Sequence, residues 1–314
     1  MEASRVNLQP IFVGGCDRSG TTFLGATLAR FPGVVALPES QFIYETARMR
    51  LEDGISLSDI AGYISRHRRF AAWRDAGCAP ARHHLCAGQS YRDFLEALIR
   101  DYARATGVEM VHAFVDHSPQ NSFNLRKLRQ IFSNLQFAHI IRDGRGVAAS
   151  LMPQDWGPND ILETAEYWEL NVAAGFAAAD FMQDAARNLR FEALIGEDAE
   201  TLNVIAKLAG AASFDTAYDN TSYCVPSYAG ATHALVDKKP SPERSMAWRA
   251  RLSERQVELF ENAAGALLEA LGYTLVFPRG SARKPGRAER ASIMVKRWFA
   301  YRRNRRRMRA RITA

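Results

Sequence analysis

Pro10-Ile-Phe-Val-Gly-Gly-Cys-Asp-Arg-Ser-Gly-Thr-Thr-Phe-Leu24 is the stretch of sequence that decides the fold. Its first apolar residues are typical of a short buried strand that runs into two glycines. The segment from Thr21 to Phe31 carries apolar side chains at helical spacing. A strand, a glycine loop and a helix in this order can hold an anion, because free backbone N–H groups and the positive end of the helix dipole face the loop. We therefore expect a phosphate-binding type of loop here.

This loop lacks the lysine that nucleoside triphosphate sites use. Gly15 and Gly20 have the spacing of a Walker loop, but Thr21 stands where that lysine would reach the outer phosphates. The loop therefore suits a shorter anion. Arg18 can supply the missing charge through its forked guanidinium, and hydroxyl donors follow it at Ser19, Thr21 and Thr22.

The rest of the chain alternates between strand-like and helix-like segments. Further strands are predicted at residues 110–115, 136–141 and 188–191. Helices are predicted at residues 41–51, 57–68, 91–106, 121–132, 199–208 and 252–272, with two more within 162–187. This order predicts an α/β fold, a three-layer P-loop-type parallel sheet flanked by helices, with a long helical insertion after the first helix.

A second motif follows the predicted strand at residues 136–141, in the run Phe137-Ala-His-Ile-Ile-Arg-Asp-Gly-Arg-Gly-Val-Ala-Ala-Ser150. Arg142 falls at the carboxyl end of the strand, and Ser150 falls in the next helix, which we expect to open at Val147. Ligands of open α/β sheets lie at this edge, so Arg142 and Ser150 can converge on one phosphate. The alternative is a salt-bridged arginine and a serine that caps or lines the helix.

Together the two motifs resemble those of the sulfotransferase family. Its donor-binding loop has a Lys- or Arg-Ser-Gly-Thr-Thr core, and its second signature is Arg-Asp-x-Arg with a serine eight residues beyond the first arginine. The resemblance implies that the donor is 3′-phosphoadenosine 5′-phosphosulfate. Its 5′-phosphosulfate would lie on Arg18, Ser19, Gly20, Thr21 and Thr22, and its 3′-phosphate on Arg142 and Ser150.

Within the family, the wider run from Arg18 resembles the branch of tyrosylprotein and carbohydrate sulfotransferases. This implies transfer of a sulfuryl group to a hydroxyl acceptor, which could be a carbohydrate, a glycolipid, a tyrosyl peptide or a small alcohol. The helical insertion would then lie on the acceptor side. Weaker matches extend over most of residues 10–275, but Phe191 stands where the family usually has tyrosine.

The resemblance also proposes catalytic residues. Glu39 falls where the family has an acidic residue, which makes it the candidate general base; the alternative is an acid that only caps the following helix. His117, in Val115-Asp-His-Ser-Pro119, stands in place of a lysine that stabilises charge on the bridging oxygen. It could do the same, act as the base, or be a buried histidine satisfied by Asp116. Arg18 is the third candidate, acting on the sulfuryl group itself.

Charge is distributed unevenly along the chain. Residues 279–314 hold fourteen Lys or Arg against one Glu, a formal charge of +13, whereas the whole chain carries +7 and residues 1–278 therefore carry −6. We expect one domain at 1–278 and a basic tail at 279–314. Residues 291–311 mix apolar and basic side chains at helical spacing, which suits contact with an anionic membrane; a polyanion partner or a disordered tail are alternatives. No specific nucleic acid is expected.

Cysteine content and hydropathy limit the remaining possibilities. Four scattered cysteines suit a reducing compartment, and neither a signal peptide nor a spanning helix is evident, so we expect a cytoplasmic protein, peripheral to the inner face of a membrane if the tail binds lipid. Cys78, His83, His84 and Cys86 match no usual zinc spacing, and no metal is expected. Two other functions stay open: a nucleotide or adenylylsulfate kinase, and a non-catalytic nucleotide-binding protein docked by its tail.

Overall fold

A computed structural model of the chain describes residues 7–78, 89–214 and 242–313. Its contacts divide the chain into two units. Unit 1 comprises Met1–Gly15, Gly20–Ile140 and Ala174–Pro240. Unit 2 comprises Cys16–Ser19, Ile141–Ala173 and Ser241–Ala314. The predicted boundary after residue 278 stays a prediction.

A five-stranded parallel sheet forms the centre of unit 1, which confirms the predicted fold class. The strands are β1 (Gln9–Gly15), β2 (Val34–Ala36), β3 (Ala113–Asp116), β4 (Gln136–Ile141) and β5 (Ala186–Arg190). Their order across the sheet is β2-β3-β1-β4-β5. β1 pairs in parallel with both β3 and β4, so that Phe12 lies opposite Asp116 on one side and Phe137 on the other.

Both faces of this sheet are buried. Successive side chains along each strand point to opposite faces, so alternate residues join two different cores. Phe12, Phe114 and Phe137 contribute to the core on one face, whereas Val13 and Val115 contribute to the core on the other. A strand buried on both faces needs apolar residues at every position, as a parallel sheet between two helical layers does. The apolar run at the start of β1 therefore reflects a three-layer arrangement.

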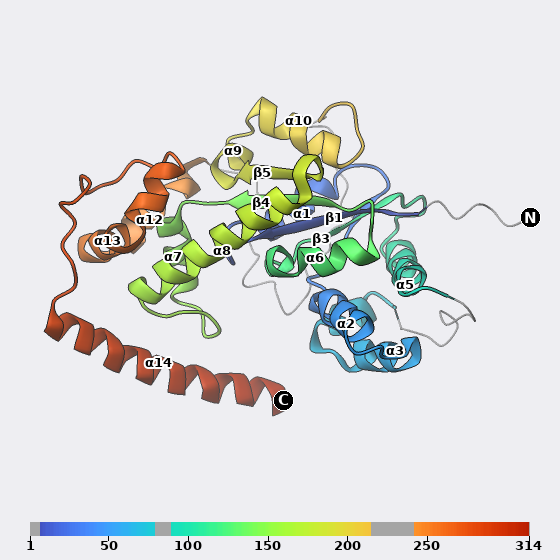
Figure 1. Cartoon of the computed structure of the whole chain (residues 1–314), viewed down its shortest axis with the longest axis horizontal. Coiled ribbons are helices and arrows are strands. Elements are labelled where there is room, and N and C mark those ends of the chain that lie inside the picture. The colour runs from blue at the N-terminus through green and yellow to red at the C-terminus, as the bar shows by residue number, and fades with distance from the viewer. Residues whose placement is uncertain (1–6, 79–88, 215–241, 314) are drawn as a thin grey trace, which may run out of the picture. The chain divides into compact units, whose positions relative to one another are not determined.

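Helices of unit 1 cover the two faces separately (Figure 1). One face is covered by α1 (Thr21–Leu28), α9 (Phe191–Ile195) and α10 (Ala199–Leu208). The other is covered by α2 (Gln41–Leu51), α3 (Leu57–Arg66), α5 (Tyr91–Ala105) and α6 (Asn121–Ile131), with the short elements η1 (Arg68–Phe70) and α4 (Ala71–Asp75). The helical insertion predicted after the first helix is thus confirmed, and it lies between β2 and β3.

Unit 2 has its own core, built around Trp168, Trp248 and Phe260. Its elements are α7 (Gly144–Leu151), the first part of α8 (Ile161–Met182), η5 (Pro242–Ser245), α12 (Trp248–Arg251), α13 (Glu254–Ala270) and α14 (Arg287–Thr313). A capping box at Ser253, whose side chain accepts from the backbone N–H of Gln256, fixes the start of α13.

The structure corrects the sequence prediction at one long segment. Two helices were expected within residues 162–187, but a single helix, α8, runs from Ile161 to Met182, followed by the short η3 (Gln183–Ala185). Gly175 does not interrupt α8. It is needed for packing, because a Cβ there would lie 2.0 Å from Nε2 of His139 on β4.

Smaller differences concern element boundaries and one strand. The strands predicted at 110–115 and 188–191 are β3 at Ala113–Asp116 and β5 at Ala186–Arg190. α7 begins at Gly144, three residues before the predicted Val147, because the Asp143 carboxylate accepts from the backbone N–H of Arg145 and caps the helix. β2 was not predicted, since its three residues are too few to show a period.

Candidate active site

The glycine loop enters unit 2 at Cys16 and is held there by α8. Asp17 Oδ2 accepts a hydrogen bond of 2.5 Å from the Tyr167 hydroxyl, and the backbone N–H of Ser19 donates to the carbonyl of Cys16. Arg18 between them has φ 69°, a left-handed conformation that non-glycine residues rarely adopt. The loop therefore has a fixed and locally strained backbone at the arginine that the sequence singled out.

Three of the predicted donor-binding residues meet within unit 2. Arg18 Nε donates to Ser150 Oγ at 3.0 Å, and Arg142 Nη1 donates to the backbone carbonyl of Arg18 at 2.9 Å. The carbonyl of Arg142 in turn accepts from Trp168 Nε1 at 3.1 Å. Two cationic forks and a hydroxyl thus converge at the carboxyl end of β4, which is a donor set suited to a phosphate.

Arg145, the second arginine of that motif, is committed to the core of unit 2. It is 3% exposed, pairs with Asp143 at 2.7 Å and Glu261 at 2.6 Å, and lies 4.3 Å from the ring centre of Trp248. Glu261 also accepts from the backbone N–H groups of Val276 and Phe277. Arg145 therefore supports the segment around Arg142 and is not available to a ligand.

The second part of the loop belongs to unit 1. Gly20 is the N-cap of α1 with φ 100°, and a Cβ on it would lie 2.5 Å from the ring of Phe191. Thr21 and Thr22 open the helix and are 4% and 6% exposed. Only glycine fits at position 20, and the helix start has the free N–H groups that an anion needs.

Glu39 lies in the turn between β2 and α2. The turn is fixed at both ends, because the N–H of Leu37 donates to the carbonyl of Val115 and Ser40 Oγ donates to the carbonyl of Pro38. Glu39 Oε2 pairs with Arg69 Nη2 at 3.0 Å. The side chain keeps 18% exposure, so its carboxylate is within reach of solvent.

His117 follows β3 and is only 1% exposed. Gly25 of α1 packs against its ring, where a Cβ would lie 2.7 Å from Cδ2. Burial lowers the pKa of His117, and the negative charges of Glu39 and Asp116 oppose this shift. Asp116 Oδ1 accepts from the N–H of Ser118 and from Asn121 Nδ2. His117 and Glu39 thus influence one another electrostatically within unit 1.

Arg69 is the residue of this cluster that sequence reasoning missed. It lies in the helical insertion as the second residue of the pair Arg68-Arg69, and nothing in that pair distinguishes a surface arginine from a partner of Glu39. The two residues are thirty positions apart, and a contact of that kind has no local signal in the sequence.

Of the residues Cys78, His83, His84 and Cys86, the structure describes Cys78 alone. Cys78 is buried, and burial raises the pKa of its thiol to about 11, which disfavours the thiolate that binds metal. His83, His84 and Cys86 lie outside the described residues, as do Cys224 and the Lys238-Lys239 pair. Within the described ranges, no three His, Cys, Asp or Glu side chains gather as a metal site would need.

Comparison with known proteins identifies the chain. A model described as "Sulfotransferase family" matches residues 10–215, more than half of the sequence. The chain belongs to the sulfotransferase family and is a transferase of that class. No curated protein matches the sequence significantly.

Solved structures agree with the fold. The sulfotransferase domain of the olefin synthase from Synechococcus PCC 7002 superposes with a TM-score of 0.57 at 18% identity, covering 88% of this chain and 98% of that one. The sulfotransferase domain from the curacin biosynthetic pathway gives a TM-score of 0.55 at 13% identity, covering 85% of this chain and 99% of that one. At such identities the likeness concerns the fold alone.

Proposed function

We propose that this sulfotransferase moves a sulfuryl group from 3′-phosphoadenosine 5′-phosphosulfate to a hydroxyl group of its acceptor. The observation that carries the proposal is the meeting of Arg18, Arg142 and Ser150 in unit 2. The guanidinium of Arg142 and the hydroxyl of Ser150 suit the 3′-phosphate that distinguishes this donor from simpler nucleotides, and Arg18 contacts both of these residues. Arg18 and Ser19, with Gly20, Thr21 and Thr22 at the start of α1, would bind its 5′-phosphosulfate.

The chemistry needs positioning, charge stabilisation and removal of one proton. The acceptor oxygen forms a bond to sulfur, the bond from sulfur to the 5′-phosphate oxygen breaks, and the hydroxyl proton must leave. Arg18 would stabilise charge on the transferring group and the leaving phosphate. Glu39 and His117 are the candidates for the proton, and no metal takes part in this scheme.

Acceptor choice is proposed to lie with the helical insertion. A carbohydrate, a glycolipid, a tyrosyl peptide and a small alcohol all offer the hydroxyl that the reaction needs. Arg69 and Glu39 belong to this side of unit 1, as η1 and the turn before α2 bring them together. A screen of acceptors from these four classes, with Glu39→Gln as the inactive control, would identify the class.

Calorimetric titration with 3′-phosphoadenosine 5′-phosphate, the spent donor, tests the proposal directly. We expect binding by the wild type and a loss of at least tenfold in Arg18→Ala and Arg142→Ala, since each removes a charged contact of about 1.5–3 kcal/mol. Arg279→Ala is the matched control, because that arginine is 80% exposed, and it should bind like the wild type. Folded wild-type protein that does not bind this nucleotide would end the proposal.

A kinase is the alternative that the loop topology leaves open. Thr21 stands in place of the Walker lysine and opposes a kinase function, because the threonine side chain is too short to reach the outer phosphates of ATP. Magnesium-dependent turnover of ATP would support the kinase instead. Donor binding without transfer to any acceptor class would favour a non-catalytic binding protein.

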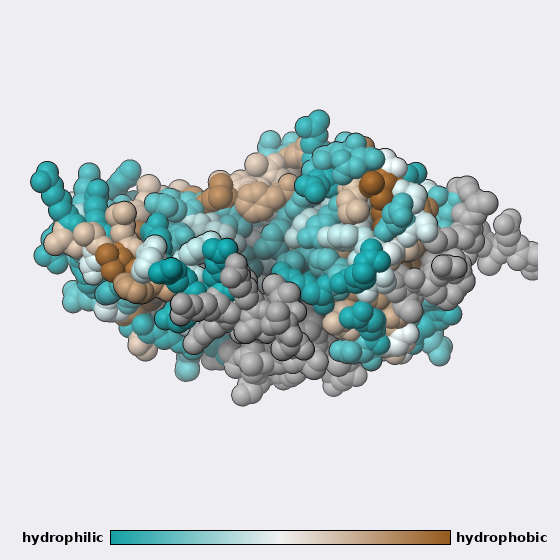
Figure 2. Space-filling model, turned by 90° about the horizontal axis from the view of Figure 1, so that it is seen from below, coloured by the Kyte–Doolittle hydropathy of each residue, from teal (hydrophilic) through white to brown (hydrophobic). Residues whose placement is uncertain are grey.

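We also propose a cytoplasmic protein in which residues 291–311 contact the inner face of an anionic membrane. None of the described helices combines the length and apolar character needed to cross a bilayer. Figure 2 shows a mostly hydrophilic face on which apolar residues gather in small separate areas. This distribution suits contact at a membrane surface through a limited region.

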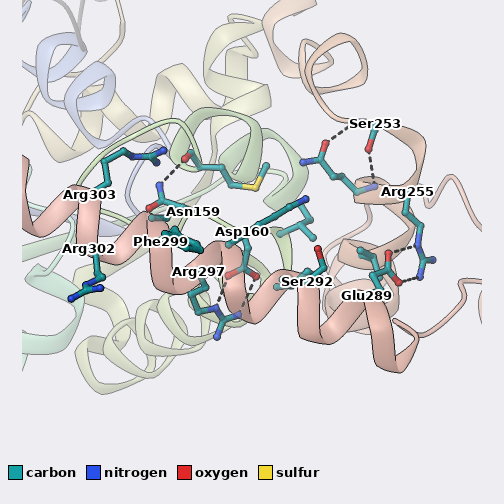
Figure 3. A pocket seen from close by; sticks show the side chains of 17 residues that line it. Asn159, Asp160, Ser253, Arg255, Glu289, Ser292, Arg297, Phe299, Arg302 and Arg303 are labelled. Carbon is teal, nitrogen blue, oxygen red and sulfur yellow. Dashed lines mark hydrogen bonds and ion pairs between the residues drawn. The ribbon is translucent and has the colours of Figure 1, made fainter.

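α14 has one face turned to the other elements of unit 2 and another open to solvent. Figure 3 shows the inner face, where Glu289 pairs with Arg255 and Arg297 pairs with Asp160. Ile293 packs against the core, and Asn304 donates to Asn159 Oδ1 at 2.6 Å. These four residues of α14 are spaced by four, four and seven positions, about one or two helical turns, and therefore form one stripe along the helix.

The solvent face of α14 joins apolar and cationic side chains. Met294 is 68% exposed, Val295 55%, Trp298 51% and Phe299 61%. Arg302 lies 4.4 Å from the ring centre of Trp298. Aromatic and aliphatic side chains enter the interface of a bilayer, and each nearby cation adds about 1 kcal/mol on an anionic surface. A nucleic acid would satisfy the charge but offer little to these apolar residues. The side chains of residues 306–313 lie outside the described part.

Sedimentation with lipid vesicles tests this contact. We expect binding to phosphatidylcholine vesicles that contain phosphatidylglycerol, little binding to phosphatidylcholine alone, and a loss of at least tenfold in the double variant Trp298→Ser, Phe299→Ser. Phe181→Ser is the matched control, because Phe181 on α8 is also 51% exposed and should not matter. Equal binding by the double variant, or binding only to RNA, would refute the membrane proposal.

A further inference from the structure

The ion pair between Glu39 and Arg69 joins two rigid segments of unit 1. Arg69 lies in η1, which is fixed by the buried ring of Phe70 and by His67, whose Nδ1 accepts from the backbone N–H of Arg69. His67 also pairs with Glu45 of α2 at 3.1 Å. The guanidinium is therefore presented to Glu39 by an element that is itself anchored, and the geometry of the pair is set before any acceptor arrives.

The contact between the two side chains orients the carboxylate. Arg69 Nη2 holds Glu39 Oε2 at 3.0 Å, and both side chains are largely buried, at 24% and 18% exposure. In such surroundings the pair is less screened by water than a surface salt bridge is. Because a carboxylate has two oxygens, holding Oε2 also restricts where Oε1 can lie.

The two candidate bases, Glu39 and His117, differ in their exposure to solvent. Glu39 remains partly exposed, whereas His117 is 1% exposed beneath Gly25 of α1. A general base must come within hydrogen-bond distance of the proton that it removes, about 2.6–3.2 Å. An acceptor hydroxyl can approach Glu39 in the observed conformation, but His117 would first have to move.

The charges around His117 agree with Glu39, and not His117, as the base. Glu39 and Asp116 favour the imidazolium, Arg69 opposes it, and burial, the largest effect, lowers the pKa of His117. Tyr44 of α2 lies among the same charged groups, and its pKa is raised, chiefly by burial, so it stays protonated. The lowered pKa of His117 therefore favours a neutral imidazole beside Glu39, Asp116 and Arg69.

We infer that Arg69 is the positioning residue of the general base: it fixes the Glu39 carboxylate, and Glu39 rather than His117 takes the proton of the acceptor hydroxyl. This inference rests on the proposed function. As the acceptor oxygen binds sulfur and the bond to the 5′-phosphate breaks, the hydroxyl proton passes to Glu39 Oε1. His117 acts on the reaction only through its contact with this cluster.

Variants of Arg69, compared with variants of Arg68, Glu39 and His117, test the inference in two measurements. Arg69→Gln removes the charge, Arg69→Lys keeps it without the fork, and Arg68→Gln is the matched control on the exposed neighbouring arginine. The first measurement is release of inorganic sulfate from 3′-phosphoadenosine 5′-phosphosulfate as a function of pH, with water as the acceptor. The second is NMR titration of the His117 imidazole, assigned with His117→Gln, which needs no turnover.

We expect Arg69→Gln to lower kcat by about 10- to 100-fold across the measured pH range, as a misplaced catalytic group does. Arg69→Lys should recover part of the rate, and Arg68→Gln should match the wild type. The pKa of His117 should rise in Arg69→Gln, which removes a positive neighbour, and fall in Glu39→Gln, which removes a negative one.

Other results would overturn the inference. Unchanged kcat and His117 titration in Arg69→Gln would show that Arg69 does not position the base. Loss of activity in His117→Gln with full activity in Glu39→Gln would make His117 the base. All Arg69 variants should still bind 3′-phosphoadenosine 5′-phosphate like the wild type, whereas failure of the wild type to bind it would refute the proposed function instead.

Discussion

Arg18 donates a hydrogen bond to the hydroxyl of Ser150 at 3.0 Å, although 132 positions separate the two residues in the chain. Arg142 completes the contact by donating to the carbonyl of Arg18. The two sequence motifs, one after β1 and one after β4, therefore meet through their side chains and not only at a common sheet edge. A substitution at any of these three residues should alter the hydrogen bonds of the other two.

Ser150→Ala should weaken binding of 3′-phosphoadenosine 5′-phosphate by about tenfold, because a hydrogen bond to a charged group is worth about 1.5–3 kcal/mol and Arg18 would lose its partner as well. Affinity for adenosine 5′-phosphate, which lacks the 3′-phosphate, should change little. Calorimetry measures both. Ser292→Ala, on the exposed surface of α14, is the control. An equal loss for both nucleotides would place Ser150 away from the 3′-phosphate.

Gly25→Ala should destabilise the protein by about 1–3 kcal/mol, because its Cβ would overlap the His117 ring in a packed core. Gly62→Ala in α3 is the matched helical control. Its Cβ would meet only the end of the Arg66 side chain, at 3.6 Å, so we expect a gain of about 0.5–1 kcal/mol from helix propensity. Urea denaturation of both variants measures the difference, and similar midpoints would contradict the packing argument.

Glu261→Gln should cost about 3 kcal/mol or more of unfolding free energy, because it leaves the buried Arg145 with an incomplete counter-charge. Two backbone N–H groups, of Val276 and Phe277, also lose a charged acceptor. Glu269→Gln is the control, since Glu269 is 37% exposed and lies 3.7 Å from Arg279, and its effect should stay within about 0.5 kcal/mol. Guanidinium denaturation checks both, and equal effects would refute the assigned role of Glu261.

Acidification should destabilise the protein through His139. Burial lowers the pKa of this histidine to about 4 from the usual 6.5, against a smaller opposing effect of its hydrogen bond with Asn188. The unfolded chain therefore binds a proton that the folded chain does not, so stability falls as pH drops from about 6.5 to 4 and this contribution levels off below.

The full contribution of His139 is roughly 3 kcal/mol by linkage. Unfolding free energies measured by urea denaturation between pH 4 and 7 should fall less steeply in His139→Gln than in the wild type. His117, whose pKa burial also lowers, would account for part of the slope that remains. Parallel curves for the two proteins would show that His139 titrates normally in the folded state.

Much of the fold was accessible from the sequence. α2, β4 and α10 were predicted with the bounds that the structure has, because their apolar spacing is strong and turn residues flank them. α8 was predicted wrongly as two helices. Gly175 lies inside the continuous helix because the ring of His139, on a strand far away in the sequence, leaves no room for a Cβ there. Periodicity reports the local conformation but not the neighbour that requires a particular residue.

The candidate site shows the same limit. Arg18, Arg142 and Ser150 could be selected from motifs, and so could Glu39 and His117. Arg69 could not be selected in this way. No pattern in the sequence indicated that Glu39 would be partly exposed and His117 buried. The commitment of Arg145 to Asp143 and Glu261 was likewise only one of the possibilities that its motif allowed.

The sequence alone determined the glycine loop without its lysine, the alternation of strands and helices, and the basic carboxyl-terminal segment, because backbone requirements, periodicity and charge are properties of neighbouring residues. The tertiary structure decided which side chains meet: Arg18 with Ser150, Arg69 with Glu39, and Gly25 with His117. Each of these contacts joins residues far apart in the chain. Their distances and burial depend on how whole elements pack, and no local pattern contains that information.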